Sequence, residues 1–146
     1  THADLQISAT DVQSLIKKFL LSEDKDNHIY MGKRQNRKTL DLFFTTMMSV
    51  ITFICSGFYF KDINAQPKIF ARSLVENLEN LPNDFNLDLA LLITSKKAGY
   101  GIKLFDLIFH SRAFNLAKGG GSFKGKIILS FSTLSYLFAN ISFFKK

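Results

Sequence analysis

The chain of 146 residues has no tryptophan, one cysteine and two prolines. A single cysteine excludes a disulfide-stabilised scaffold and a zinc site built from thiolates, because both need several cysteines. The scarcity of proline, together with only eight glycines, excludes collagen-like and proline-rich repeats. With 47% hydrophobic residues, the chain is also too apolar for intrinsic disorder. Its length is that of about one folded domain.

Two segments lack charged residues: a run of 19 at 42–60 and a run of 18 at 127–144. A helix rises 1.5 Å per residue, so each run is about as long as the roughly 30 Å hydrocarbon core of a bilayer. Basic residues flank both runs, as expected for side chains that reach lipid headgroups. Ten of the 16 phenylalanines lie within or just before these runs. The pattern predicts two transmembrane helices, although the second run is more polar and partly alternates like a strand.

We therefore predict a mainly α-helical integral membrane protein with two transmembrane helices and a helical extramembrane loop. The predicted segments are an N-terminal amphipathic helix with a basic connector (1–39), a first transmembrane helix (40–60), an extramembrane amphipathic region (61–126) and a second transmembrane helix (127–144). Within the extramembrane region we expect one helix from Pro67 to about Leu81 and helices on both sides of a turn at 96–101. A β-hairpin across that turn is the alternative.

Small residues recur at helical spacing within each run. The predicted stripes are Thr45, Ser49, Thr52 and Ser56 in the first run, and Ser132, Ser135, Ala139 and Ser142 in the second. Membrane helices associate through small residues and interhelical hydrogen bonds, because lipid provides no hydrophobic drive between helices. We predict that each helix packs through its stripe, against the other helix or against a partner subunit, with a phenylalanine-rich side opposite.

Basic residues lie next to the ends of the two runs. Those that we expect to set the orientation or to contact lipid headgroups are Lys33, Arg34, Arg37, Lys38, Lys145 and Lys146. By the positive-inside rule they place both ends of the chain on the cytoplasmic, matrix or stromal side. The expected location is an organellar inner membrane, a thylakoid or a bacterial plasma membrane.

No motif for catalysis, cofactor binding or metal binding stands out in the sequence. The glycine-rich stretch 119–126 lacks the spacing and the hydroxyl residue of a phosphate-binding loop, and the three histidines have no metal-ligand spacing. Neither uncharged run contains an ionisable residue of the kind that proton relays and ion pathways use. We therefore predict no catalytic residue, no cofactor, no metal, no nucleic-acid partner and no small-molecule substrate.

The function that these features favour is an accessory, structural or assembly subunit of a multi-subunit membrane complex, such as an organellar or bacterial energy-transducing complex. Its expected partners are other membrane-protein subunits and the lipid bilayer, and it is not expected to be an enzyme. Two alternatives remain open. One is a self-associating membrane effector or pore-forming protein, and the other is a soluble helical interaction domain that buries both runs in its core.

Overall fold

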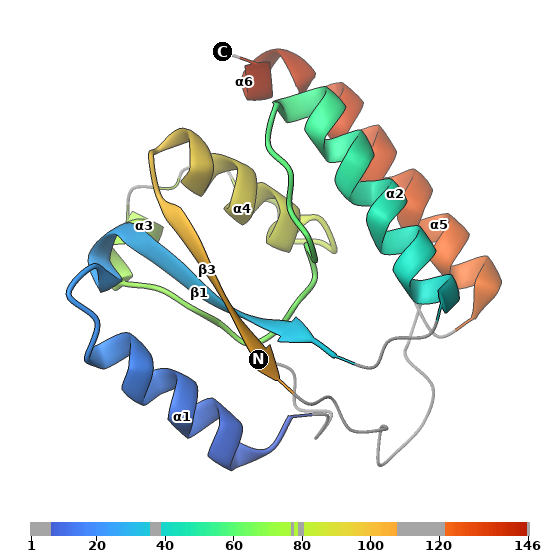
Figure 1. The fold of residues 1–146 in the computed structure, drawn as a ribbon. Helices are drawn as coiled ribbons and strands as arrows, with labels where there is room; N and C mark the ends of the chain where they lie inside the picture. Colours follow the sequence, from blue (N-terminus) through green and yellow to red (C-terminus); the bar gives the residue numbers. More distant parts are fainter. Residues whose placement is uncertain (1–6, 36–38, 77, 79–80, 108–121, 146) are drawn as a thin grey trace. The chain divides into compact units, whose positions relative to one another are not determined.

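The computed structural model describes residues 7–35, 39–76, 78, 81–107 and 122–145 (Figure 1). The elements in chain order are α1 (Ala9–Leu20), the short 3-10 helix η1 (Lys25–Asn27), β1 (His28–Arg34), α2 (Thr39–Ser56), β2 (Lys68–Ile69), α3 (Arg72–Glu76), α4 (Leu87–Lys97), β3 (Gly101–Leu107), α5 (Phe123–Ala139) and α6 (Ile141–Lys145). The fold is mostly helical with one small sheet, so the prediction of a mainly helical protein is correct at that level.

The chain forms two compact units, each assembled from three separate stretches. The sheet unit consists of residues 1–36, 65–79 and 95–114, and the helix unit of residues 37–64, 80–94 and 115–146. Helix α4 begins in the helix unit and ends in the sheet unit, and its five consecutive residues from Leu89 to Ile93 are all buried. The chain therefore alternates between the two units instead of completing one before starting the other.

The sheet unit is built around three strands in the order β2-β1-β3. β1 pairs with β3 in parallel along seven residues, from His28 opposite Gly101 to Arg34 opposite Leu107. β1 also pairs with β2 in antiparallel fashion, with Tyr30 opposite Ile69. Parallel neighbours need a long crossover connection, which here is the whole segment between β1 and β3. β1 is the central strand and contains the buried residues Ile29, Tyr30 and Met31.

Helix α1 packs its apolar face on this sheet. Ser8 caps the helix by accepting a hydrogen bond from the Asp11 backbone nitrogen at 3.0 Å. Leu15 and Phe19, four residues apart and so on the same side of the helix, form a buried core with Tyr30. The Phe19 and Tyr30 rings meet edge to face with their centroids 5.3 Å apart. The predicted N-terminal amphipathic helix thus forms the hydrophobic core of the sheet unit.

Three predictions for the segments of this unit are wrong. β1 lies inside the stretch predicted as a basic connector, and β3 replaces the helix predicted after the turn at 96–101. Because β3 follows a helix, the alternative hairpin across the turn is also wrong. In place of a helix from Pro67 to about Leu81, the described residues form β2 and the short helix α3. In each case the segment contributes a strand to the sheet. The pairing of β1 with β2 and β3 outweighs the helix-like spacing of the apolar residues.

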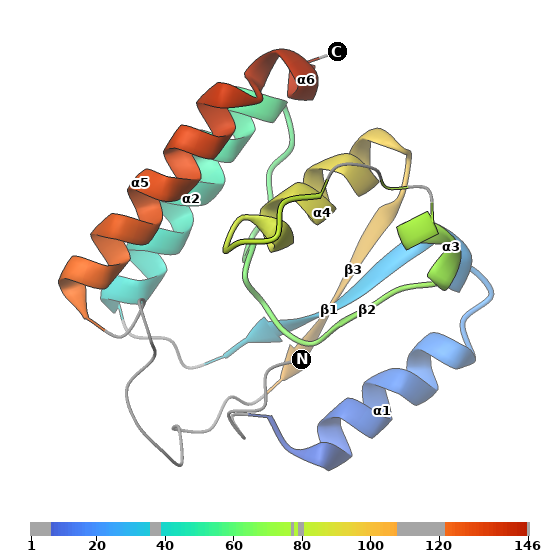
Figure 2. The same ribbon diagram turned by 180° about the vertical axis from the view of Figure 1, so that it is seen from behind.

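The helix unit contains α2 and α5, which lie side by side and run in the same direction (Figures 1 and 2). Lys126 in the first turn of α5 is 2.5 Å from Asp41 in the first turn of α2, so an ion pair joins the beginnings of the two helices. α2 ends at Ser56, where Gly57 takes a positive φ of 77° and its nitrogen donates to the Phe53 carbonyl.

The second uncharged run does not form one continuous helix. α5 begins at Phe123, before the run, and ends at Ala139, because Asn140 leaves the helical conformation before α6 starts. Among the described residues, α2 is the one helix with the length and apolar composition to cross a membrane. The prediction of two such helices is therefore not confirmed.

Candidate functional site

The residues that α2 and α5 bury are mostly small and polar. Ser49 and Thr52 of α2 are 0% exposed, and Thr133 of α5 is also buried. The Ser49 hydroxyl donates to the Thr45 carbonyl at 2.9 Å, and the Thr133 hydroxyl donates to the Leu129 carbonyl at 3.0 Å. The Ser49 and Thr133 hydroxyls are thus hydrogen-bonded to carbonyls of their own helices, which lets them lie in an interior without water.

Large apolar side chains instead lie on the outside of the same helices. Those more than 45% exposed are Leu42, Phe43, Val50, Phe53 and Ile54 of α2, Phe123, Ile128, Phe131 and Phe138 of α5, and Phe143 of α6. Only 22% of α2 is buried. Exposed apolar area on this scale is typical of a surface that meets a membrane or another protein. We define these ten residues as the apolar face of the helix unit.

The two predicted packing stripes lie in different surroundings. In the first, Ser49, Thr52 and Ser56 are buried and Thr45 is half-buried. In the second, Ser132 is half-buried, whereas the remaining three residues, Ser135, Ala139 and Ser142, are exposed. α5 buries Thr133 and Leu137 in their place. The two stripes therefore do not face each other, and a role for the second in contacting a partner stays a prediction.

The basic residues predicted to set the orientation are only partly described. Lys33 belongs to β1, and its Nζ lies 3.0 Å from Asp106 Oδ1 of β3. Arg34 ends the same strand opposite Leu107. Lys145 ends α6 and is described only by its backbone, and the other three, Arg37, Lys38 and Lys146, lie outside the described residues. Lys33 and Arg34 thus belong to the sheet unit, in the strand that pairs with β3.

The connections of α2 restrict how this helix can meet a membrane. β1 precedes α2 and β2 follows it, and the two strands are hydrogen-bonded neighbours. The Gly32 nitrogen also donates to the Pro67 carbonyl at 3.0 Å, and a side chain at position 32 would collide with the Gln66 carbonyl. The two ends of α2 therefore lead into neighbouring strands of one sheet.

The connection that follows α2 is partly buried in the protein. It consists of the eleven residues from Gly57 to Pro67, which form no helix or strand. Fully extended they reach about 36 Å, enough to run back along α2. Phe60, Asp62, Ile63 and Ala65 of this connection are buried in the protein. The crossing of a bilayer by residues 40–60 stays a prediction, since α2 has the length and the apolar composition for it.

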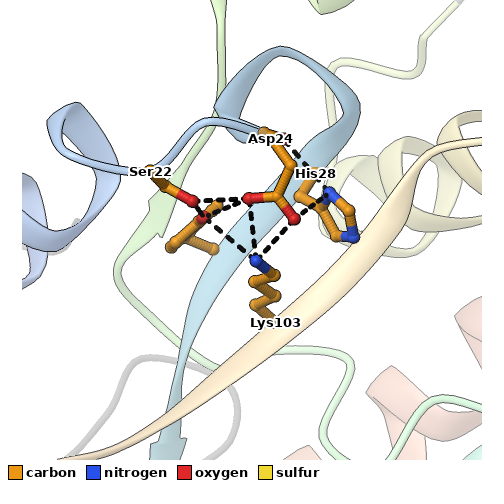
Figure 3. Close-up of polar contacts among 5 residues, drawn as sticks. Ser22, Asp24, His28 and Lys103 are labelled. Atoms are coloured by element: carbon orange, nitrogen blue, oxygen red, sulfur yellow. Dashed lines mark hydrogen bonds and ion pairs between the residues drawn. The ribbon is translucent and has the colours of Figure 1, made fainter.

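A second candidate site is the polar cluster around Asp24, in the turn between α1 and β1 (Figure 3). Lys103 of β3 reaches the carboxylate with Nζ 2.8 Å from Oδ1 and 2.6 Å from Oδ2. Ser22 donates a hydrogen bond to Oδ1 at 2.5 Å, and His28 Nδ1 lies 3.2 Å from Oδ2. The Tyr30 hydroxyl donates to the Ser22 hydroxyl and lies 3.1 Å from Asp24 Oδ1.

The electrostatics of this cluster favour its charged forms. The hydrogen bond from Lys103, aided by the one from Ser22, holds the pKa of the Asp24 carboxyl well below its ordinary value. In return, the hydrogen bond to Asp24 raises the pKa of the Lys103 ammonium. Both side chains are more than a third exposed, at 38% and 39%, so water screens the pair.

These shifts indicate a structural role for the cluster. A general acid or base works best with a pKa near the working pH, whereas both groups here move away from neutrality. Each oxygen of the carboxylate is occupied by neighbouring side chains. The cluster therefore ties the turn after α1 to β3. In the part of the chain that the structure describes, no group of three or more histidine, cysteine, aspartate or glutamate side chains could hold a metal ion.

Comparison of the chain with known protein families, with characterised proteins and with solved structures finds no match. The functional argument therefore depends on the apolar face and on the Asp24 cluster alone. The sequence pattern indicates the apolar face, because its residues lie in or beside the uncharged runs. It gives no sign of the cluster, because Asp24 and Lys103 are 79 residues apart and meet only when β1 pairs with β3.

Proposed function

We propose that the chain is a non-catalytic accessory or assembly subunit of a multi-subunit membrane complex, with other membrane-protein subunits and the bilayer as partners. The observation that carries the proposal is the reversed polarity of α2 and α5, which bury Ser49, Thr52 and Thr133 while the ten large residues of the apolar face stay exposed. Helices that meet lipid or membrane proteins have this arrangement, because small residues allow close packing and the surroundings accept apolar side chains.

The Asp24 cluster supports the non-catalytic part of the proposal. The pKa shifts of Asp24 and Lys103 keep both groups charged, so neither is suited to transfer protons near neutral pH. The sheet unit has an ordinary apolar core of Leu15, Phe19 and Tyr30. We infer that it is the part of the subunit outside the bilayer. A location in an energy-transducing membrane of an organelle or a bacterium suits this function and is part of the proposal.

Blue-native electrophoresis of the chain, extracted from its own membrane in mild detergent, tests the subunit function. We expect migration well above 16.6 kDa and co-purification of other membrane proteins at constant ratio. The variant Ile54→Asp, on the apolar face, should lose these partners. Val75→Asp on α3 is the matched control, because Val75 is also exposed but lies in the sheet unit, and this variant should keep them.

Two results would contradict the proposal. Migration of the wild type as an isolated chain would exclude a stable complex. A homo-oligomer without other chains, together with dye release from liposomes by the purified protein, would instead support a self-associating membrane effector.

A further inference from the structure

We propose that the helix unit lies in one leaflet of an anionic bilayer without crossing it, so that both ends of α2 stay on the same side. This inference rests on the proposed membrane function and adds to it the partner surface and the mode of attachment. Three observations support it: the connections of α2, the distribution of apolar residues on α2 and α5, and the position of the lysines.

The connections of α2 require both of its ends to be on the side of the sheet unit. β1 enters α2 and β2 receives the chain after it, and Tyr30 and Ile69 of these strands are paired. Helix α5 runs in the same direction as α2 (Figures 1 and 2), with Lys126 and Asp41 paired at their first turns. The ends of the two helices thus correspond, which is the geometry of two helices lying together on a surface.

The apolar residues lie on one side of each helix, not all around it. On α2, Phe43, Val50 and Ile54 are seven and four residues apart and share one face, while Ser49 and Ser56 are buried. On α5, Ile128, Phe131 and Phe138 are exposed at steps of three and seven, while Thr133 and Leu137 are buried. A helix in the plane of an interface has one apolar face of this kind.

Lysines border the apolar face and determine which lipid it favours. The helix unit contains eight basic and four acidic residues, a net charge of +4. Lys61, shortly after α2, is exposed, and Lys124 is exposed in the first turn of α5, four residues before Ile128. Ammonium groups beside an apolar face attract the phosphates of anionic headgroups. The occupant that fits this combination is an anionic leaflet.

Binding of the purified full chain to phosphatidylcholine vesicles, with and without phosphatidylglycerol, tests the partner surface by co-sedimentation. We expect at least tenfold stronger binding to the anionic vesicles. Phe131→Asp should weaken binding at least tenfold and Lys124→Gln about fivefold, whereas Val75→Asp should bind like the wild type. Equal binding to both vesicle types, or no effect of Phe131→Asp, would overturn the proposal.

Labelling with a membrane-impermeant maleimide tests the mode of attachment. Cys55 is the one cysteine of the chain and is buried, so a Cys55→Ala background allows single cysteines to be introduced at exposed positions at the start of α2 and after its end. Thr39→Cys and Lys61→Cys serve this purpose. On intact vesicles we expect both to react as fast as after addition of detergent. Protection of either one until detergent is added would overturn attachment to a single leaflet.

These assays separate the inference from the function on which it rests. Binding to anionic vesicles with both cysteines accessible, combined with migration as an isolated chain on the native gel, would refute the subunit function and leave the attachment intact. Co-purification of partners with one protected cysteine would refute the attachment and leave the subunit function intact.

Discussion

The sheet unit and the helices α2 and α5 of the helix unit place polar and apolar residues in opposite ways. The sheet unit buries Leu15, Phe19 and the Tyr30 ring, and it keeps the Asp24–Lys103 pair partly in water. The helix unit buries Ser49 and Thr52 and exposes most of its phenylalanines. Burial of apolar area from water stabilises the first arrangement. In α2 and α5 the large apolar side chains that stay exposed gain little from that effect.

The same residue type illustrates the difference. Phe19 in the sheet unit is buried against Tyr30, whereas Phe131 and Phe138 in α5 are almost two-thirds exposed. Composition alone does not distinguish these environments, because phenylalanine is abundant in both units. The comparison shows that the environment of a phenylalanine depends on whether its helix buries apolar or small polar residues. Substitutions that change one unit's core should therefore have effects that are not seen in the other.

The largest effect is expected at the core of the sheet unit. Tyr30 is 2% exposed and contacts Phe19, Phe105 and the Asp24 cluster, so Tyr30→Ala should lower the free energy of unfolding by about 3–5 kcal/mol. Tyr59→Ala, at a tyrosine that is 55% exposed just after α2, should change it by less than about 0.5 kcal/mol. Urea unfolding followed by circular dichroism measures both, and equal losses would mean that the two units do not differ in this way.

A smaller effect of opposite sign is expected inside the helix unit. The Thr52 hydroxyl is buried and has no hydrogen-bond partner among the described residues, so Thr52→Val should raise the free energy of unfolding by about 1–3 kcal/mol. Thr133→Val is the matched control: its hydroxyl donates to the Leu129 carbonyl, and its loss should lower stability by about 1 kcal/mol. Thermal unfolding in mild detergent distinguishes the two. A lower stability of Thr52→Val would show that this hydroxyl has a partner in solution.

Much of the helical structure could be predicted because its signals are local. The amphipathic spacing of Leu15 and Phe19 predicts α1, and the uncharged run at 42–60 contains most of α2. Helix α5 covers most of the second run, but Asn140 ends it before α6. The apolar face could be predicted for the same reason, since helical periodicity separates phenylalanine from serine.

The sheet could not be predicted because it depends on residues far apart in the chain. β1 lies in a charged stretch whose composition favours a connector, and its strand conformation depends on β3, about seventy residues later. In β3, Ile102 and Phe105 are three residues apart. This spacing is typical of one face of a helix and does not show the alternation that indicates a strand. Asp106 does not interrupt the strand, because Lys33 and Gln35 bind its carboxylate. The sheet also links the two ends of α2, through β1 and β2, which no local pattern in the sequence indicates.

The smallest effect is expected at the Asp24–Lys103 pair, which is partly exposed, and it should appear as a change in pH dependence. The pKa of Asp24 is lowered in the folded state, chiefly by Lys103, so at low pH the unfolded chain binds more protons than the folded one. Stability from this group is complete above the ordinary aspartate pKa of about 4 and is lost as the pH falls through the lower folded value. The raised pKa of Lys103 places the corresponding loss on the other side, in alkali, as the pH rises above the ordinary lysine value.

Lys103→Met removes the main cause of the Asp24 shift, so the decrease in unfolding free energy between about pH 5 and pH 2 should become shallower than in the wild type. Arg72→Met, which removes an almost fully exposed ion pair with Glu76 in the same unit, should leave that slope unchanged. Urea unfolding at a series of pH values measures the slope, and both variants should retain the wild-type spectrum at neutral pH. Because Asp24 and Lys103 both belong to the sheet unit, vesicle binding by the helix unit should not change in Lys103→Met. If acid stability were the same with and without Lys103, the cluster would not hold the turn after α1 to β3.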